Sequence, residues 1–212
     1  FTANDMGSIE ANQVTNRYGD TEWSIPDAGT RSALMADYDI AIPIERTDLA
    51  KLLANPQGDY LQRALAAMQR KKDKVIYDAI RGAALRKTDE SGTFSGVSLS
   101  GSQVIAAGGT GMTKAKIITA KKQFRTNEAD EHNGEELYIA YDAGMMEDIL
   151  SDTTLTSADY MAAKMLQEGD ISGKWLGFNW VPYEALTGTS TKTTVAWAKT
   201  GVHVGTGETV TT

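Results

Sequence analysis

The chain has 212 residues, of which 41% are hydrophobic and 23% are charged, a composition typical of one large globular domain or two small ones. It contains no cysteine, which excludes a disulfide framework and a thiolate metal site and fits a reducing cytoplasm. The net charge of −7 opposes binding of the chain as a whole to nucleic-acid phosphates.

No apolar run approaches the roughly 20 residues needed to cross a bilayer, so we expect no membrane partner. The chain begins with Phe1 and stops in a polar segment rich in β-forming residues. We therefore expect that it was cut or processed from something longer.

The first third of the chain predicts extended structure. Residues 1–14 are polar and weakly periodic, which fits an arm or a short connecting helix. Between residues 16 and 43, glycines and prolines separate short β-prone pieces, a pattern that predicts an extended hairpin. Trp23 and Ile25 fall near its expected tip, among acidic residues. Two interpretations of Trp23 remain open: another surface covers it, or it folds back on its own domain.

A long helix is predicted between residues 59 and 84, because apolar residues recur there every three or four positions. At roughly 1.5 Å per residue it would be roughly 39 Å long, more than a simple core requires. Asp59 and Gln62 have the spacing of a capping box at its start. Gly82 weakens the other end, and we place the stop between Ala84 and Lys87.

Helices and strands alternate in the rest of the chain. Residues 91–111 are rich in Gly and Ser and predict a loop or a short hairpin. We expect helices at 48–54, 113–124, 142–150 and 157–169, an acidic turn at 127–136, and strands at 137–141, 175–183 and 193–205. Pro182 puts the second of these strands at a sheet edge or a strand end. This order predicts an α+β fold without a regular βαβ repeat.

The side chains that carry chemistry form no catalytic, cofactor-binding or metal-ligating pattern. The acidic turn lacks the ligand spacing of a calcium loop, so we expect it to be solvated. A local basic patch on the long helix leaves nucleic-acid contact open as the less favoured alternative; its residues are Arg70, Lys71, Lys72 and Lys74. We expect a protein that is not an enzyme and requires no cofactor.

Four stretches in succession resemble the major capsid proteins of tailed bacteriophages, which share the Hong Kong 97-type fold. They are GDTEWSIPDAGTR with the following MADYDIAIPIERTDLAKLLANPQGDYLQRALAAMQRKKDKVIYDAIRGAA, then GTGMTKAKI, TSADYMAAKMLQEGDISGKWLGFNWVPY and TVAWAKTGVHVGTGETVTT. Together they cover most of the chain from residue 18 to residue 212. The resemblance implies a structural protein whose copies assemble as hexamers and pentamers into an icosahedral shell around the phage genome.

The resemblance also implies a layout for the chain. Residues 1–15 would end an N-terminal arm, and residues 16–45 would form an E-loop reaching over a neighbouring subunit. Residues 46–127 would form a peripheral domain with a spine helix at 59–84. Residues 128–190 would form an axial domain, and residues 191–212 would form strands returning toward the peripheral domain. The subunit-interface candidates are then Arg17, Tyr18, Trp23, Ile25 and Arg31.

The implied partners are further copies of the chain, scaffolding, portal or decoration proteins, and packaged double-stranded DNA bound without sequence specificity. The implied location is the virion capsid, with assembly in the host cytoplasm. An encapsulin-like protein of the same fold, which encloses cargo in place of a genome, is the alternative.

Overall fold

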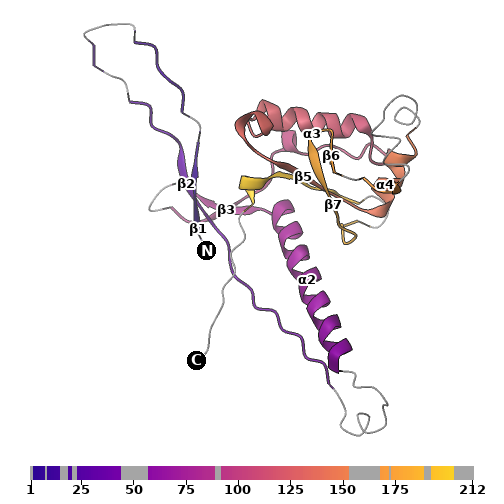
Figure 1. Cartoon of the computed structure of the whole chain (residues 1–212). Coiled ribbons are helices and arrows are strands. Elements are labelled where there is room, and N and C mark those ends of the chain that lie inside the picture. The colour runs from indigo at the N-terminus through magenta and orange to yellow at the C-terminus, as the bar shows by residue number, and fades with distance from the viewer. Residues whose placement is uncertain are drawn as a thin grey trace, which may run out of the picture. The chain divides into compact units, whose positions relative to one another are not determined.

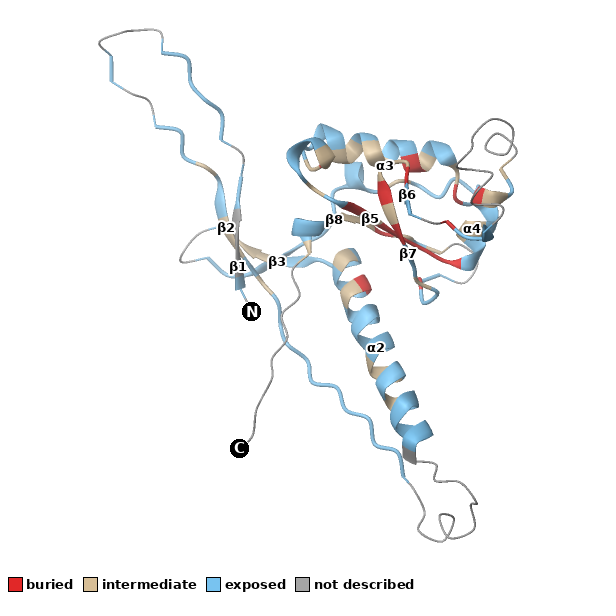
Figure 2. Ribbon diagram, viewed as in Figure 1, coloured by how far each residue is buried: buried red, intermediate tan, exposed pale blue. Residues whose placement is uncertain are grey.

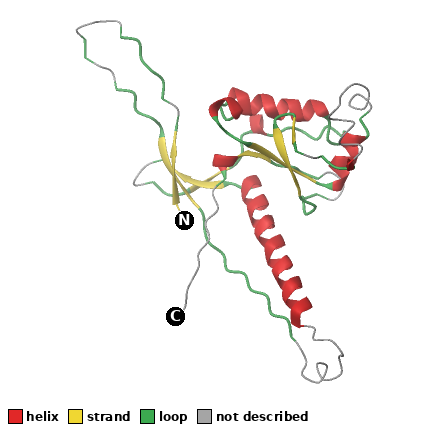
Figure 3. Ribbon diagram, viewed as in Figure 1, coloured by secondary structure: helices red, strands yellow, loops and turns green. Residues whose placement is uncertain are grey.

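The computed structural model describes most of the chain and contains both helices and strands (Figures 1 and 3). The described residues are 2–7, 9–14, 19–20, 23–43, 57–88, 92–152, 168–171, 173–188 and 192–202. Two compact units divide the chain: the first comprises Phe1–Arg70 and Gly82–Leu99, and the second comprises Lys71–Arg81 and Ser100–Thr212. The mixture of helix and sheet agrees with the predicted α+β class. The helices expected at 48–54 and 157–169 lie outside the described residues, apart from the last two positions of the second.

The first unit contains a four-stranded antiparallel sheet with the strand order β1-β2-β3-β4. The strands are β1 (Thr2–Met6), β2 (Ala28–Ser32), β3 (Ala84–Lys87) and β4 (Ser95–Val97). β1 pairs with β2 over its whole length, so the connecting helix considered for the first residues is wrong. Weak periodicity in β1 hid a strand whose partner lies more than twenty residues away in the sequence.

The hairpin that β1 and β2 close continues beyond the sheet as an extended ribbon (Figure 1). At its base the Gly7 amide donates to the Asp27 carbonyl oxygen at 2.7 Å. The hairpin therefore begins earlier than the predicted residue 16. Residues 33–43, which the prediction included in it, follow β2 as an extended segment in which no strand is assigned.

The predicted long helix is present as α2 (Gln57–Arg81). Asp59 lies in its first turn, not at the capping position, and its carboxylate still faces the positive end of the helix dipole. The predicted stop between Ala84 and Lys87 is wrong, because the helix ends at Arg81 and those four residues form β3. The backbone pairing of β3 with β2 outweighs the local preference for continuing the helix.

The second unit contains a four-stranded sheet with the strand order β6-β7-β5-β8. The strands are β5 (Leu137–Tyr141), β6 (Lys174–Trp175), β7 (Phe178–Pro182) and β8 (Ala196–Ala198). The central strand β5 pairs in parallel with β7 and antiparallel with β8. A parallel pair needs a crossover connection, and α4 (Ala143–Leu150) lies within it.

A tight turn splits the predicted strand at 175–183 into β6 and β7, which pair antiparallel. Leu176 and Gly177 form the turn with φ of 50° and 84°. Positive φ at both central residues is typical of a type I′ turn, whose twist matches that of the strands it joins. Pro182 is the last residue of β7, which confirms its predicted place at a strand end.

Local sequence signals predict the starts of α3 and α4 correctly. Thr113 occupies the N-cap of α3 (Lys114–Thr126), although its side chain makes no capping hydrogen bond. Asp142 caps α4 by accepting a hydrogen bond from the Met145 amide at 2.9 Å. The predicted strand at 137–141 has the bounds of β5.

The hydrophobic core lies in the second unit, as Figure 2 shows by the red residues on its sheet and helices. Its larger cluster consists of Met112, Ile117, Leu137, Ile139, Tyr141, Ile149, Ile171, Trp175, Phe178, Trp180 and Ala198. A smaller cluster joins Tyr77 of α2 to Ala140, Leu186 and Val195. Among the described residues of the first unit, none is buried.

Candidate functional site

Exposed apolar side chains of the first unit form the first candidate site. Of the twenty large hydrophobic residues that the described chain exposes, sixteen belong to this unit. Burying a side chain such as Leu, Ile or Phe contributes about 1.5–3 kcal/mol, so such exposure is unfavourable unless another surface covers it. Clustered exposed apolar residues mark interaction sites.

The hairpin carries the most exposed of these side chains. Trp23 is 91% exposed and Ile25 is 87% exposed. This exposure favours the interpretation in which another surface covers Trp23. Arg31 lies in β2 directly opposite Arg86, while the candidates Arg17 and Tyr18 lie outside the described residues.

Hydrogen bonds across the hairpin involve Ser24 and distinguish the face of the hairpin that carries Ser24 from the opposite face. The Ser24 hydroxyl donates to the Glu10 carbonyl oxygen and accepts from the Asn12 side-chain amide, both at 3.2 Å. Successive side chains of an extended chain point to opposite faces. Trp23 and Ile25 therefore share the face opposite Ser24, and we call this pair the hairpin apolar face.

At the base of the hairpin, an ion pair offsets the facing arginines of β2 and β3. Asp27 accepts a hydrogen bond from the Arg86 guanidinium at 3.1 Å. Like charges directly opposite each other destabilise a strand pair, and Asp27 supplies the opposite charge. A Cβ on Gly29 would lie 3.0 Å from Arg86 Nε, so the glycine leaves room for this guanidinium.

The N-terminal half of α2 also exposes apolar side chains. Leu61 and Leu65, one turn apart, are 62% and 58% exposed. Residues four apart lie on the same helix face. Part of the apolar stripe that predicted the helix is therefore exposed along this half within the described chain, while Ala64 and Met68 are half-buried.

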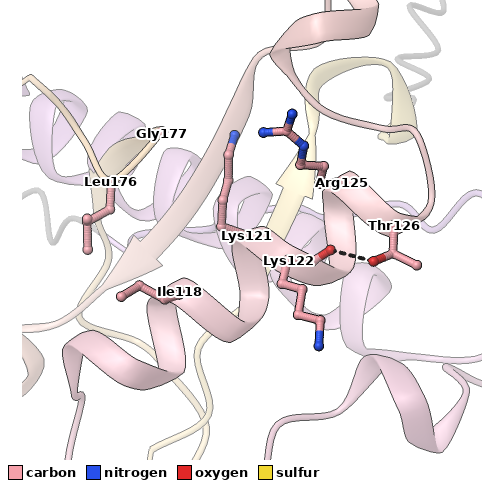
Figure 4. A pocket seen from close by; sticks show the side chains of 7 residues that line it. All are labelled: Ile118, Lys121, Lys122, Arg125, Thr126, Leu176 and Gly177. Atoms are coloured by element: carbon pink, nitrogen blue, oxygen red, sulfur yellow. Dashed lines mark hydrogen bonds between the residues drawn. The ribbon is translucent and has the colours of Figure 1, made fainter.

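A basic groove along α3 is the second candidate site, and the sequence reading missed it (Figure 4). It has a volume of about 520 Å³ and is lined by Ile118, Lys121, Lys122, Arg125, Thr126, Leu176 and Gly177. Figure 4 shows Lys121 and Arg125 extending to one side of the helix and Lys122 to the other. The spacing of Ile118, Lys121 and Arg125 places these three side chains near one another on the helix, but the residues that complete the groove come from the β6–β7 turn.

One lysine of the groove, Lys121, is neutralised by a carboxylate. Glu131 forms ion pairs with Lys121 and, at 3.1 Å, with Lys174. The Lys121 ammonium group, assisted by Lys174, lowers the pKa of Glu131 from its ordinary 4.5 to about 2, against the opposing effect of partial burial. Lys122 and Arg125 have no carboxylate partner among the described residues, so they give the groove its net positive charge.

The acidic turn at 127–136 is partly solvated: Glu128 and Glu136 are exposed, while other carboxylates of the turn contact groups of the protein. Asp130 is buried and caps a short 3-10 helix (Glu131–Asn133). Glu135 accepts from the Thr200 hydroxyl at 2.6 Å. Glu136 accepts from the Tyr138 hydroxyl and pairs with Lys199, and both contacts lower its pKa.

The described part of the chain contains no cluster of His, Asp and Glu side chains suited to hold a metal ion. None of its helices combines the length and the apolar character that a bilayer crossing requires. In the basic patch predicted on α2, Lys74 pairs with Asp78 at 2.9 Å. Part of that charge is thus balanced locally.

A buried tyrosine hydroxyl in the last part of α2 hydrogen-bonds to the second unit's core, a contact that no sequence pattern predicted. The Tyr77 hydroxyl donates to the Thr193 carbonyl oxygen at 2.5 Å and accepts from the Thr187 amide at 3.1 Å. Its ring lies 5.2 Å from that of Tyr183. This contact positions the helix and has no catalytic geometry.

Comparison with known proteins gives two matches. A family model described as phage capsid protein matches residues 1–212. A solved structure from Mycobacterium phage Che8 is similar in fold, with a TM-score of 0.61 and 20% sequence identity over 92% of this chain and 66% of that chain. No curated protein matches the sequence. The present chain thus spans just under two thirds of the length of that structure.

Proposed function

Because the chain belongs to the phage capsid protein family, we propose that its copies assemble as hexamers and pentamers into an icosahedral shell that encloses the phage genome. Membership of this structural family gives the chain a capsid role, as the sequence resemblance predicted. The number and symmetry of the copies, and the enclosed DNA, are the proposal.

One observation supports assembly most strongly. The described residues of the first unit include no buried side chain, whereas Trp23, Ile25 and many other apolar side chains are exposed. A domain normally buries its apolar surface in a core of its own. In a closed, symmetric ring of copies, the exposed apolar side chains of every subunit would be buried against a neighbouring subunit.

The layout of the proposed shell subunit follows from the two units. The hairpin would be the E-loop, with Trp23, Ile25 and Arg31 among its contacts to a neighbour, and Arg17 and Tyr18 remain candidates there. Helix α2 would be the spine of the peripheral domain. The sheet of the second unit would belong to the axial domain, built mainly from residues 128–190.

The charge of −7 suits a container for DNA. A lining that bound phosphates tightly would oppose both packing and ejection of the genome. We propose virion assembly in the host cytoplasm, with double-stranded DNA held without sequence specificity and with scaffolding, portal or decoration proteins as further partners.

Electron microscopy of the protein expressed with its phage's other structural proteins tests this proposal. Closed particles that contain nuclease-protected DNA are expected. Closed particles that contain protein cargo and no DNA would favour the encapsulin-like alternative. Monomers alone, under every salt and concentration condition, would contradict assembly altogether.

A further inference from the structure

Helix α3 concentrates positive charge in an acidic protein. Its thirteen residues include no acidic residue and five cations, which are Lys114, Lys116, Lys121, Lys122 and Arg125. The chain as a whole has a net charge of −7. Two of the five cations are engaged within the subunit: Lys121 by Glu131, and Lys116 by the Ala107 and Gly111 carbonyl oxygens at 2.6 Å. Lys122 and Arg125 therefore give the α3 groove positive charge that no described carboxylate neutralises.

An apolar surface adjoins these two cations. Ile118 lies one helical turn before Lys122 and two turns before Arg125, so it shares their side of the helix. Its side chain is 51% exposed, and Leu176 lines the same groove from the β6–β7 turn (Figure 4). The groove thus combines apolar contact area with cations in one place.

Contacts within the subunit hold the groove in shape before any partner arrives. Leu176 and Gly177 form a tight turn with positive φ. Glu131 pairs with Lys121 of α3 and with Lys174 of β6, which fastens the helix to the strand beside the turn. A preformed groove lowers the entropy cost of binding, because neither wall has to be ordered by the partner.

The chemistry of the groove selects an acidic peptide over other anions. A nucleic-acid backbone offers phosphate and sugar, so it would leave Ile118 and Leu176 uncovered. An Arg guanidinium binds a carboxylate through two parallel hydrogen bonds, and a large apolar side chain would cover the apolar wall. The volume of about 520 Å³ falls in the range of pockets that enclose a small ligand or a few side chains.

The acidic turn of the second unit is not such a segment. Glu135 accepts a hydrogen bond from the Thr200 hydroxyl, and Glu136 accepts one from the Tyr138 hydroxyl. Both carboxylates thus serve their own subunit. Because the net charge of −7 also opposes the approach of a second copy, the favoured partner is a different protein.

We propose that the α3 groove binds an acidic peptide segment of a second protein. One large apolar side chain of that segment packs against Ile118 and Leu176, and its carboxylates pair with Lys122 and Arg125. All the residues of this site belong to one chain, so binding does not require the shell. The inference goes beyond the proposed function by assigning a binding surface and the chemistry of its partner.

Fluorescence anisotropy of a labelled peptide, added to the full chain before assembly, tests the site. The probe is fluorescein-labelled Glu-Ser-Glu-Ser-Phe-Ser-Glu-Ser-Glu, and two control peptides carry Lys in place of Glu or Ala in place of Phe. We expect the probe to bind with a Kd below about 1 mM. The Lys peptide should not bind, and the affinity for the probe should fall as salt is added.

Charge reversal in the groove provides the first variant. Lys122→Glu/Arg125→Glu should weaken probe binding about ten-fold or more, because like charges would then face each other. The matched control Arg70→Glu/Lys72→Glu makes the same change of net charge at exposed positions of α2 that do not line the groove. It should weaken binding by less than about two-fold, since charges that do not contact the ligand are screened.

The apolar contact has a readout that general charge attraction would not produce. Ile118→Ser should weaken binding of the Phe probe about five-fold, because the Phe ring loses its apolar contact. The same change should leave binding of the Ala peptide unaltered. Coupling between Ile118 and the Phe ring in this double-mutant cycle is evidence of direct contact.

Four results would overturn the proposal. They are no probe binding at about 1 mM, equal losses in the two charge-reversal variants, no coupling between Ile118 and the Phe ring, and preferential binding of a DNA duplex that the groove variant abolishes. Self-association that the groove variant abolishes in sedimentation velocity would instead make a second copy the occupant, and so would also overturn it. None of these measurements requires a shell, so their failure leaves the proposed function standing.

Discussion

The Tyr77 hydroxyl offers the sharpest test of how the long helix is held to the core. Tyr77 is buried and bridges the Thr193 carbonyl oxygen and the Thr187 amide. The Tyr77→Phe change keeps the ring and its packing but leaves two backbone groups without this partner. A buried polar group deprived of its hydrogen bond costs about 1–3 kcal/mol.

The Thr193 amide also donates to the Thr187 carbonyl oxygen at 3.0 Å, but these are not the two groups that bond Tyr77. Both hydrogen bonds of the Tyr77 hydroxyl are only partly buried, so the loss should fall in the lower part of the range for two unpaired groups. We expect the free energy of unfolding to drop by about 2–3 kcal/mol. Urea unfolding followed by tryptophan fluorescence measures it, since Trp175 and Trp180 are buried in the same unit.

Tyr183→Phe is the matched control. The Tyr183 hydroxyl is buried without a hydrogen-bond partner among the described residues, and burial raises its pKa. Removing it should be neutral or slightly stabilising. If Tyr77→Phe lowers the stability by no more than Tyr183→Phe does, the bridging role of Tyr77 is refuted.

Three further predictions follow from the surfaces. Glu131 has a pKa of about 2 in the folded protein, below its ordinary 4.5. Its contribution to the free energy of unfolding is therefore complete above about pH 4.5 and is lost as the pH falls toward 2. Glu131→Gln should make the stability depend less on pH in this acidic range. Gly177→Ala should lower the free energy of unfolding by about 1–3 kcal/mol, because φ is 84° and the new Cβ would lie 2.8 Å from Lys121 Nζ. Urea unfolding measures this loss, and an unchanged midpoint would contradict the turn geometry. Trp23→Ala should leave the urea midpoint within about 0.5 kcal/mol of wild type, as expected for an exposed site, yet reduce assembly in sedimentation velocity; normal assembly would remove Trp23 from the interface.

Elements whose signals are local were predicted well from the sequence. The strand at 137–141 and the cap at Asp142 have the bounds that alternation and capping chemistry indicated. Both signals act within a few residues of where they are read. The same holds for Pro182, which cannot donate to a strand ladder and so ends β7.

Elements that depend on distant partners were predicted poorly. Ala84–Lys87 has good helix formers but becomes β3, because β2 offers it a backbone ladder. β1 was missed for the same reason. The parallel pairing of β5 with β7 brings together residues about forty positions apart, which no local pattern encodes.

The two candidate surfaces also differ in how far local sequence signals could predict them. Trp23 and Ile25 could be singled out from composition, because large apolar residues in an acidic, Gly- and Pro-rich stretch are unusual. The α3 groove could be found only from the fold, since the β6–β7 turn supplies Leu176 and Gly177 from fifty or more residues away. The sequence alone therefore predicted the exposed hairpin and missed the α3 groove.

The measurement that tests the account most directly is a cryo-electron microscopy reconstruction of particles formed by the protein. The account predicts a closed icosahedral shell of hexamers and pentamers in which Trp23 of each subunit is covered by a neighbouring copy. Particles in which Trp23 stays exposed to solvent, or a protein that forms no closed shell, would contradict it.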